Sequence, residues 1–84
     1  MPYQVVVKKR VVKALAKINE PNYTRLKEAI YKLAEDPRPS GCQPLKNRPG
    51  YRIRVGNYRI IYEIQEDVLT IYVLALGHRK DIYR

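Results

Sequence analysis

The stretch YRIRVGNYRIIYEIQ, residues 51–65, decides how this chain folds. Apolar and polar side chains alternate before and after Gly56-Asn57, a pattern that predicts two half-buried strands. Gly56-Asn57 itself is typical of the two-residue turn that closes a β-hairpin, and such a turn fixes the register of the strands. The predicted pairs across the hairpin are Val55 with Tyr58, Arg54 with Arg59, and Ile53 with Ile60.

Successive side chains of a strand point to opposite faces, so the hairpin is expected to have an apolar face and a basic face. The apolar face carries Tyr51, Ile53, Val55, Tyr58, Ile60, Tyr62 and Ile64, and the other face carries Arg52, Arg54, Arg59, Ile61 and Glu63. Arg54 and Arg59 would stand directly opposite each other, where like charges are destabilising. Guanidinium groups present planar forks that match phosphate oxygens, so this face is a candidate phosphate site. The alternative is a solvated face whose arginines pair with Glu63 and nearby carboxylates.

Upstream of the hairpin the sequence predicts a strand at residues 3–7 and two helices. Val11, Leu15 and Ile18 recur at helical spacing along the first helix, and residues 19–22 break it. The second helix begins at Pro21 or Asn22, and Asp36-Pro37 ends it. Its apolar positions are Tyr23, Leu26, Ile30 and Leu33. So short a break predicts an antiparallel helical hairpin.

Prolines and glycines punctuate a loop at residues 37–50, which carries Lys46 and Arg48. After the β-hairpin, Glu66-Asp67 turns the chain, residues 68–76 are expected to form an interior strand, and residues 77–84 form a charged tail. The predicted order is β-α-α-β-β-β in a single domain over residues 1–84. We therefore predict an α+β fold, with a helical hairpin packed on one face of a mostly antiparallel four-stranded sheet.

Composition adds a charge imbalance, with 17 Lys and Arg against eight Asp and Glu, a net charge of +9. Such an imbalance is typical of proteins that bind a polyanionic partner. The one cysteine, Cys42, cannot form an internal disulfide, lies in no metal-ligand pattern, and is interpreted as a loop thiol without a role. The sequence shows no signal peptide and no apolar run of membrane-spanning length, so we expect a cytoplasmic protein without a membrane partner.

The tail adds His78, Arg79 and Tyr83, and the end of the last strand should return to the level of Arg59 and the hairpin tip. His78 is the one side chain here that titrates near neutral pH without perturbation, although a lone histidine is more often incidental. Tyr83 is a candidate stacking platform for a base, or it folds back on the sheet. The residues alone thus indicate a domain that binds RNA or phosphate and has a candidate active site.

The strings YRIRVGNYRIIY at residues 51–62 and LGHRKDIY at residues 76–83 resemble the RelE family of toxins, within the RelE/ParE superfamily. The element order agrees, so the resemblance covers essentially the whole chain. It implies the toxin of a type II toxin–antitoxin system, which inhibits translation by cutting mRNA in the ribosomal A site. In that reaction the 2′-hydroxyl attacks the adjacent phosphate, leaving a 2′,3′-cyclic phosphate and a 5′-hydroxyl. No metal or other cofactor takes part.

The resemblance also implies roles for individual residues. Arg59 and Arg79 would hold the scissile phosphate, Arg52 and Arg54 would bind flanking phosphates, and Tyr83 would orient the substrate. Lys46, with Arg48 beside it in the loop, is implied to bind RNA. The best-known family member has lysines at the positions of Arg52 and Arg54, and arginine effectively never deprotonates. Either His78 or Tyr83 then handles protons, or catalysis rests on positioning and electrostatics.

The implied partners are a RelB-like antitoxin, the ribosome, mRNA and, through the antitoxin complex, operator DNA. Two other functions remain open. A ParE-like toxin would share the fold and inhibit DNA gyrase by binding, and Arg59, Arg79 and Tyr83 argue against it. A non-catalytic RNA-binding domain would bind RNA with steep salt dependence and produce no cut ends.

Overall fold

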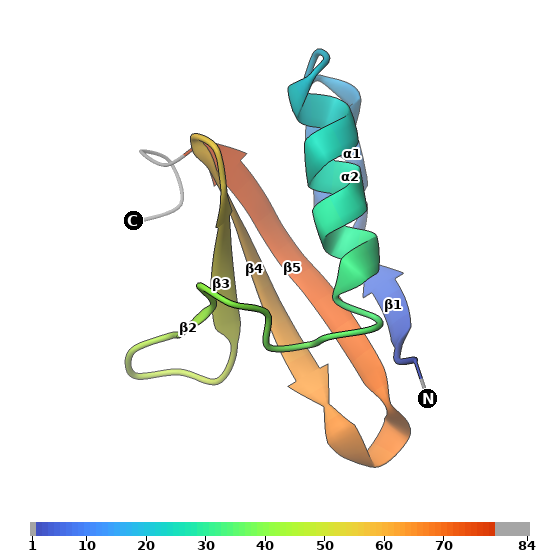
Figure 1. The fold of residues 1–84 in the computed structure, drawn as a ribbon, viewed down its shortest axis with the longest axis vertical. Helices are drawn as coiled ribbons and strands as arrows, with labels where there is room; N and C mark the ends of the chain where they lie inside the picture. The colour runs from blue at the N-terminus through green and yellow to red at the C-terminus, as the bar shows by residue number, and fades with distance from the viewer. Residues whose placement is uncertain (1, 79–84) are drawn as a thin grey trace.

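Two α-helices and one sheet are formed by residues 2–78, the part of the chain that the structure, a computed structural model, describes (Figure 1). In chain order the elements are β1 (Gln4–Val7), α1 (Lys9–Ala16), α2 (Asn22–Lys32), β2 (Gln43–Pro44), β3 (Tyr51–Val55), β4 (Tyr58–Gln65), the 3-10 turn η1 (Glu66–Val68) and β5 (Thr70–His78). This confirms the predicted α+β class and the helical hairpin.

The sheet has five strands in the order β1-β5-β4-β3-β2, one more than predicted. β1 runs parallel to β5 and the other neighbours are antiparallel, so β5 is interior as expected. The additional strand, β2, pairs only Gln43 with Arg52 and Pro44 with Tyr51. A two-residue strand inside a proline-rich loop has no alternating pattern, and for this reason the sequence did not indicate it.

The hairpin of β3 and β4 has the predicted register, with Val55 opposite Tyr58, Arg54 opposite Arg59 and Ile53 opposite Ile60. Gly56 in the turn has φ +59°, a left-handed conformation that glycine adopts at little cost. On the other side of β4, Tyr58 pairs with His78 and Arg59 with Gly77. The end of β5 therefore lies beside the hairpin tip, as predicted.

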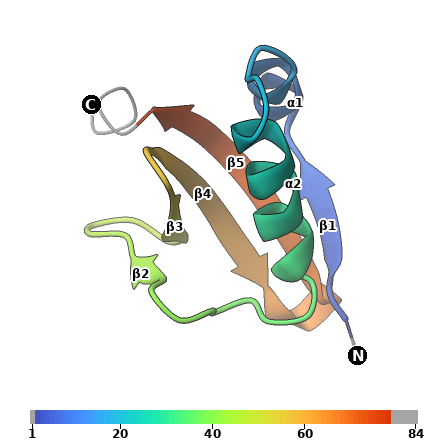
Figure 2. The ribbon, with the colours of Figure 1, turned by 45° about the horizontal axis from the view of Figure 1, so that its top comes forward.

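Both helices cover one face of the sheet, and Figure 2 shows α2 descending beside β5 after the turn that follows α1. The core lies between these layers and consists of Val11, Leu26, Ile30, Leu33, Ile53, Ile60, Tyr62, Ile71, Val73 and Leu76. Leu15 and Ile18 pack against it and are partly buried. The hydrophobic effect of closing this interface, about 25 cal/mol per Å² of apolar surface, is the main force holding the helices on the sheet.

Some boundaries differ from the predicted ones. α2 ends at Lys32, before Asp36, because residues 33–35 continue only as turns. β5 begins at Thr70, since Leu69 has φ +47° after the 3-10 turn and cannot belong to a strand. The strand also extends through His78, so the first two residues of the expected tail lie in the sheet.

Candidate nucleic-acid interface

The basic face of the hairpin forms as predicted, and its arginines differ in exposure. Arg54 and Arg59 are direct partners across β3 and β4, and Arg52 lies two residues along β3 on the same face. Arg59 is only 4% exposed, whereas Arg54 is exposed. Cβ atoms of such cross-strand partners are about 4.5–5.5 Å apart. Burial holds Arg59 in place, and the exposed Arg54 side chain can adjust to a ligand beside it.

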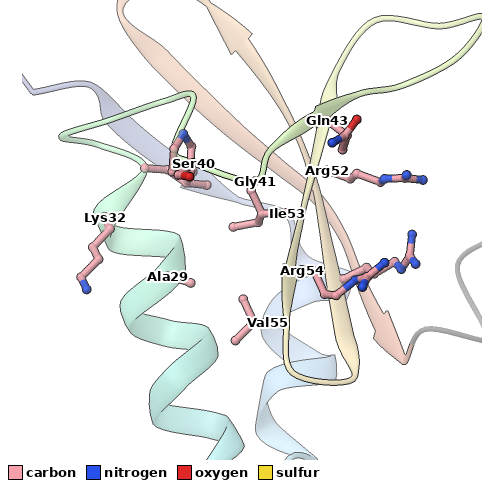
Figure 3. A pocket seen from close by; sticks show the side chains of 12 residues that line it. Ala29, Lys32, Ser40, Gly41, Gln43, Arg52, Ile53, Arg54 and Val55 are labelled. Atoms are coloured by element: carbon pink, nitrogen blue, oxygen red, sulfur yellow. The ribbon is translucent and has the colours of Figure 1, made fainter.

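A groove of about 530 Å³ runs along this part of β3. Figure 3 shows Arg52 and Arg54 on one side of the strand, with Ile53 and Val55 on the side that faces α2. The groove is lined by Ala29, Lys32, Leu33, Pro39, Ser40, Gly41, Gln43, Arg52, Ile53, Arg54, Val55 and Arg59. Its lining thus joins a cluster of guanidinium groups to an apolar wall.

His78 does not join the arginine cluster. As the partner of Tyr58 in the β4–β5 ladder, it takes the same face as Tyr58, which is the helix-facing side. The two rings meet edge to face with centroids 5.7 Å apart. Gly77, the partner of Arg59, occupies the arginine face at this level. Arg79 and Tyr83, the two other tail residues that the sequence predicts in the site, lie outside the described residues.

A second, smaller groove of about 240 Å³ involves the loop after β2. Arg48 lines it, and so do Lys8 and Arg10 from the beginning of α1, above an apolar floor that includes Ile61 and Ala75. Lys46 is exposed in the same loop. The sequence does not mark Lys8, Arg10 and Lys32 as site residues, because lysine and arginine on or beside helices commonly face solvent.

The loop between α2 and β2 is held against β3 and β4 by an aromatic cluster. Arg38 donates from Nε to the Tyr51 hydroxyl at 3.1 Å, lies over the Tyr51 ring, and pairs with Glu66 at 2.9 Å. These hydrogen bonds raise the pKa of Arg38. Tyr51 stacks on Tyr62, whose hydroxyl donates to the Pro37 carbonyl at 2.6 Å. The anchored loop carries Pro39, Ser40 and Gly41 to the larger groove.

Cys42 is half-buried and packs against the core, so it is better described as a packing residue than as a thiol without a role. Burial is the main cause that raises the pKa of the Tyr62 phenol, and the neighbouring Cys42 raises it further. Residues 2–78 contain no group of three or more His, Cys, Asp and Glu side chains that could hold a metal ion. Over the same residues, neither helix has the length and apolar character needed to cross a membrane.

Comparison with known proteins places this geometry in a family. The sequence model of one protein family, the ParE toxin of the type II toxin–antitoxin system parDE, matches residues 5–83. The RelE1 protein of Methanocaldococcus jannaschii is 30% identical over 88 residues, covering 100% of this chain and 98% of its own length.

Solved structures agree with these matches. The archaeal RelE–RelB complex from Pyrococcus horikoshii contains a chain that is 31% identical, with a TM-score of 0.81 over 96% of this chain and 99% of that one. The RelB–RelE complex from Methanococcus jannaschii gives 31% identity and a TM-score of 0.72, covering 93% and 94%. The chain therefore belongs to the RelE family of toxins of type II toxin–antitoxin systems, within the superfamily that also includes ParE.

Proposed function

We propose that this toxin is a ribosome-dependent endoribonuclease that cuts mRNA in the A site and so inhibits translation. The observation that carries the proposal is the pairing of Arg54 with Arg59 across the hairpin, with Arg52 beside them on the same face. Positive charges held this close favour an anion between them. A phosphodiester of an RNA strand supplies that anion.

The proposed reaction is attack of the 2′-hydroxyl on the adjacent phosphate, which yields a 2′,3′-cyclic phosphate and a 5′-hydroxyl. Arg59 would hold the scissile phosphate, because a 4%-exposed guanidinium keeps its orientation and acts where water screens it little. Preorganised donors of this kind are commonly the largest contribution to catalysis. Arg52 and Arg54 would bind flanking phosphates, and the exposed Lys46 and Arg48 would guide the strand further along.

Proton transfer requires a group other than the arginines, which stay protonated. His78 faces the helix side of the sheet beside Tyr58, so its position gives the role little support. We therefore propose that Tyr83 transfers protons, or that catalysis rests on positioning and electrostatics. Arg79 would bind the phosphate together with Arg59. No metal or other cofactor enters this scheme.

A RelB-like antitoxin is the proposed partner in the cell, because relatives of this chain were solved as RelE–RelB complexes. The toxin would meet the ribosome and mRNA in the cytoplasm, and operator DNA only through the antitoxin complex.

Gyrase inhibition is the second candidate, since the matching family model is that of the ParE toxin. Induced expression of the wild type and of Arg79→Ala, followed by primer extension on a reporter mRNA, separates the candidates. The nuclease proposal expects cuts within codons that disappear in the variant and in an untranslated copy of the message. Growth arrest with damaged DNA and uncut mRNA would favour gyrase, and RNA binding without cut ends would indicate a non-catalytic domain.

A further inference from the structure

The loop between β2 and β3 is a closed turn that carries Arg48 to the smaller groove. The Leu45 N–H donates to the Gly50 carbonyl at 3.0 Å, and Asn47 between them has φ +64°. The Leu45 side chain lies against the sheet, because a Cβ on Gly50 would lie 3.1 Å from Leu45 Cδ1 and 3.4 Å from Glu63 Cγ. Leu45 and Arg48 both line the groove. The turn therefore holds a guanidinium group over the face of the sheet that the helices leave open.

Ile61 is buried on this open face and contributes to the floor of the smaller groove. It is 6% exposed, yet it lies outside the core cluster between the helices and the sheet. Its cross-strand partners are Arg52 on β3 and Ala75 on β5, and partners in a ladder share a face. This row lies two residues along the strands from the pair of Arg54 and Arg59, a separation of about 7 Å. One nucleotide of an extended RNA strand spans a similar distance.

Three cationic side chains line the groove around this apolar floor. Arg48 comes from the loop before β3, whereas Lys8 and Arg10 come from the beginning of α1, which follows the other edge strand, β1. Within the part of the chain that the structure describes, none of the three forms an ion pair with a carboxylate. Glu63 also lines the groove, and its charge offsets one of the three. The groove therefore combines a positive charge excess with an apolar floor.

We propose that the smaller groove binds the RNA phosphate one nucleotide away from the phosphate held between Arg54 and Arg59. Arg48 donates to this second phosphate from one side, and Lys8 and Arg10 donate to it from the other. The ribose beside it rests on the apolar floor. Contacts to phosphates fix the register of a nucleic-acid strand on a protein without reading its bases. The assignment rests on the proposed function, in which the neighbouring phosphate is the scissile one.

Glu63 limits the groove to one phosphate. It lies two residues beyond Ile61 on β4 and on the same face, so a further phosphate along the strands would meet a carboxylate. An RNA strand that runs along this face thus finds cations at two successive rows and a repulsive charge at the third. The second phosphate therefore sets the position of the first one at the arginine pair, and the RNA leaves the sheet beyond it.

The test is a titration of the ¹⁵N-labelled protein with 2′-O-methyl-RNA, which has no 2′-hydroxyl to attack the phosphate, followed by NMR. A dinucleotide carries a single phosphate and a trinucleotide carries a pair. Both should shift the backbone amides of Arg54 and Arg59, and the trinucleotide should add shifts at Arg48, Ile61 and Ala75. The trinucleotide should bind about tenfold more tightly, since hydrogen bonds to charged groups are among the strong ones.

Removing single charges shows whether the groove causes this gain in affinity. Arg48→Gln and Arg10→Gln should each lose most of the gain from the second phosphate and keep the affinity for the dinucleotide. Lys9→Gln is the matched control, because Lys9 is exposed in the same basic run and does not line the groove. It should keep the full gain, since the change in net charge is the same.

An equal loss in Lys9→Gln and Arg10→Gln would overturn the proposal, because it would show general attraction to a basic protein. A trinucleotide that gains no affinity, or that shifts no amide of the groove, would also overturn it. So would groove shifts from acetyl-Glu-Glu-amide, which has the same charge as the trinucleotide, and none from RNA. The titration involves no cleavage, so uncut mRNA in the expression experiment would count against the nuclease and not against the groove.

Discussion

Arg54 and Arg59 occupy directly opposite positions on β3 and β4, yet one guanidinium is exposed and the other is almost fully buried. Val55 and Tyr58 form the hydrogen-bonded pair that closes the turn, so Arg54 and Arg59 form the next, non-hydrogen-bonded pair, in which side chains lie closer. The protein thus places two like charges at the nearest spacing that the sheet offers. Such an arrangement costs stability in the free protein and favours an anionic ligand.

Replacing Arg54 should therefore raise the stability of the protein and lower its activity. Arg54→Gln is expected to raise the free energy of unfolding by up to about 1 kcal/mol, because it removes the opposed charge. RNA cleavage should fall about tenfold or more with loss of a charged hydrogen-bond donor. Urea unfolding and cleavage assays measure the two effects, with Arg25→Gln on α2 as the matched control. A less stable Arg54→Gln protein would contradict the repulsion argument.

The position of His78 predicts a small role in catalysis. General acid–base groups contribute about 10²–10⁴-fold, whereas His78→Ala should change kcat/KM by less than about tenfold, since the ring faces Tyr58 on the helix side. His78→Ala should also leave the shape of the pH profile of cleavage unchanged. A loss of activity as large as that of an arginine variant would instead assign the proton transfer to His78.

Tyr62 should make the protein sensitive to alkaline pH. Burial raises the pKa of its phenol above the ordinary value of about 10, so above that pH the unfolded chain releases a proton that the folded chain retains. The free energy of unfolding is then expected to decrease as the pH rises above about 10. Urea unfolding at pH about 8 and about 11 measures the decrease.

Tyr62→Phe is the control for this effect. It should cost about 1 kcal/mol at neutral pH, because the hydrogen bond to the Pro37 carbonyl is lost, and it should show a smaller alkaline decrease. An equal decrease in the free energy of unfolding of both proteins would show that groups other than Tyr62 cause it.

Gly50 is expected to tolerate no side chain. It has φ +119°, and an added Cβ would lie 3.0 Å from the Tyr62 carbonyl oxygen and 3.1 Å from Leu45 Cδ1. Gly50→Ala should lower the free energy of unfolding by about 1–3 kcal/mol. Gly41→Ala is the matched comparison, because Gly41 also has a positive φ of +91° but nothing within 4 Å of its added Cβ. Thermal unfolding should show the larger loss for Gly50→Ala, and equal losses would mean that only the backbone conformation matters.

Much of the hairpin was predictable because its signals are local. A Gly-Asn turn between two alternating runs determines the register, and through it the faces of Arg54 and Arg59. The helices followed from apolar spacing, and Val11, Leu26 and Ile30 are all buried. The ends of elements were less predictable, since the last residues of α2 and the turn before β5 depend on tertiary contacts as well as on sequence.

The features that depend on contacts distant in sequence could not be predicted. β2 exists only because two loop residues meet β3. The burial of Arg59 and the position of His78 on the helix-facing side require knowledge of how β5 pairs with β4. Lys8 and Arg10 come to the loop of Arg48 through the packing of α1, and the basic run at residues 8–10 does not by itself show which surface it joins.

The most direct test of the central claim uses purified ribosomes that hold an mRNA codon in an empty A site. Wild-type protein and Arg59→Lys are compared by analysing the ends of the RNA products. Lysine keeps the charge and loses the planar fork, so kcat should fall about 10²–10³-fold while circular dichroism shows a folded protein. The account predicts 2′,3′-cyclic phosphate and 5′-hydroxyl ends from the wild type only when ribosomes are present. Intact mRNA on ribosomes treated with folded wild-type protein would contradict it.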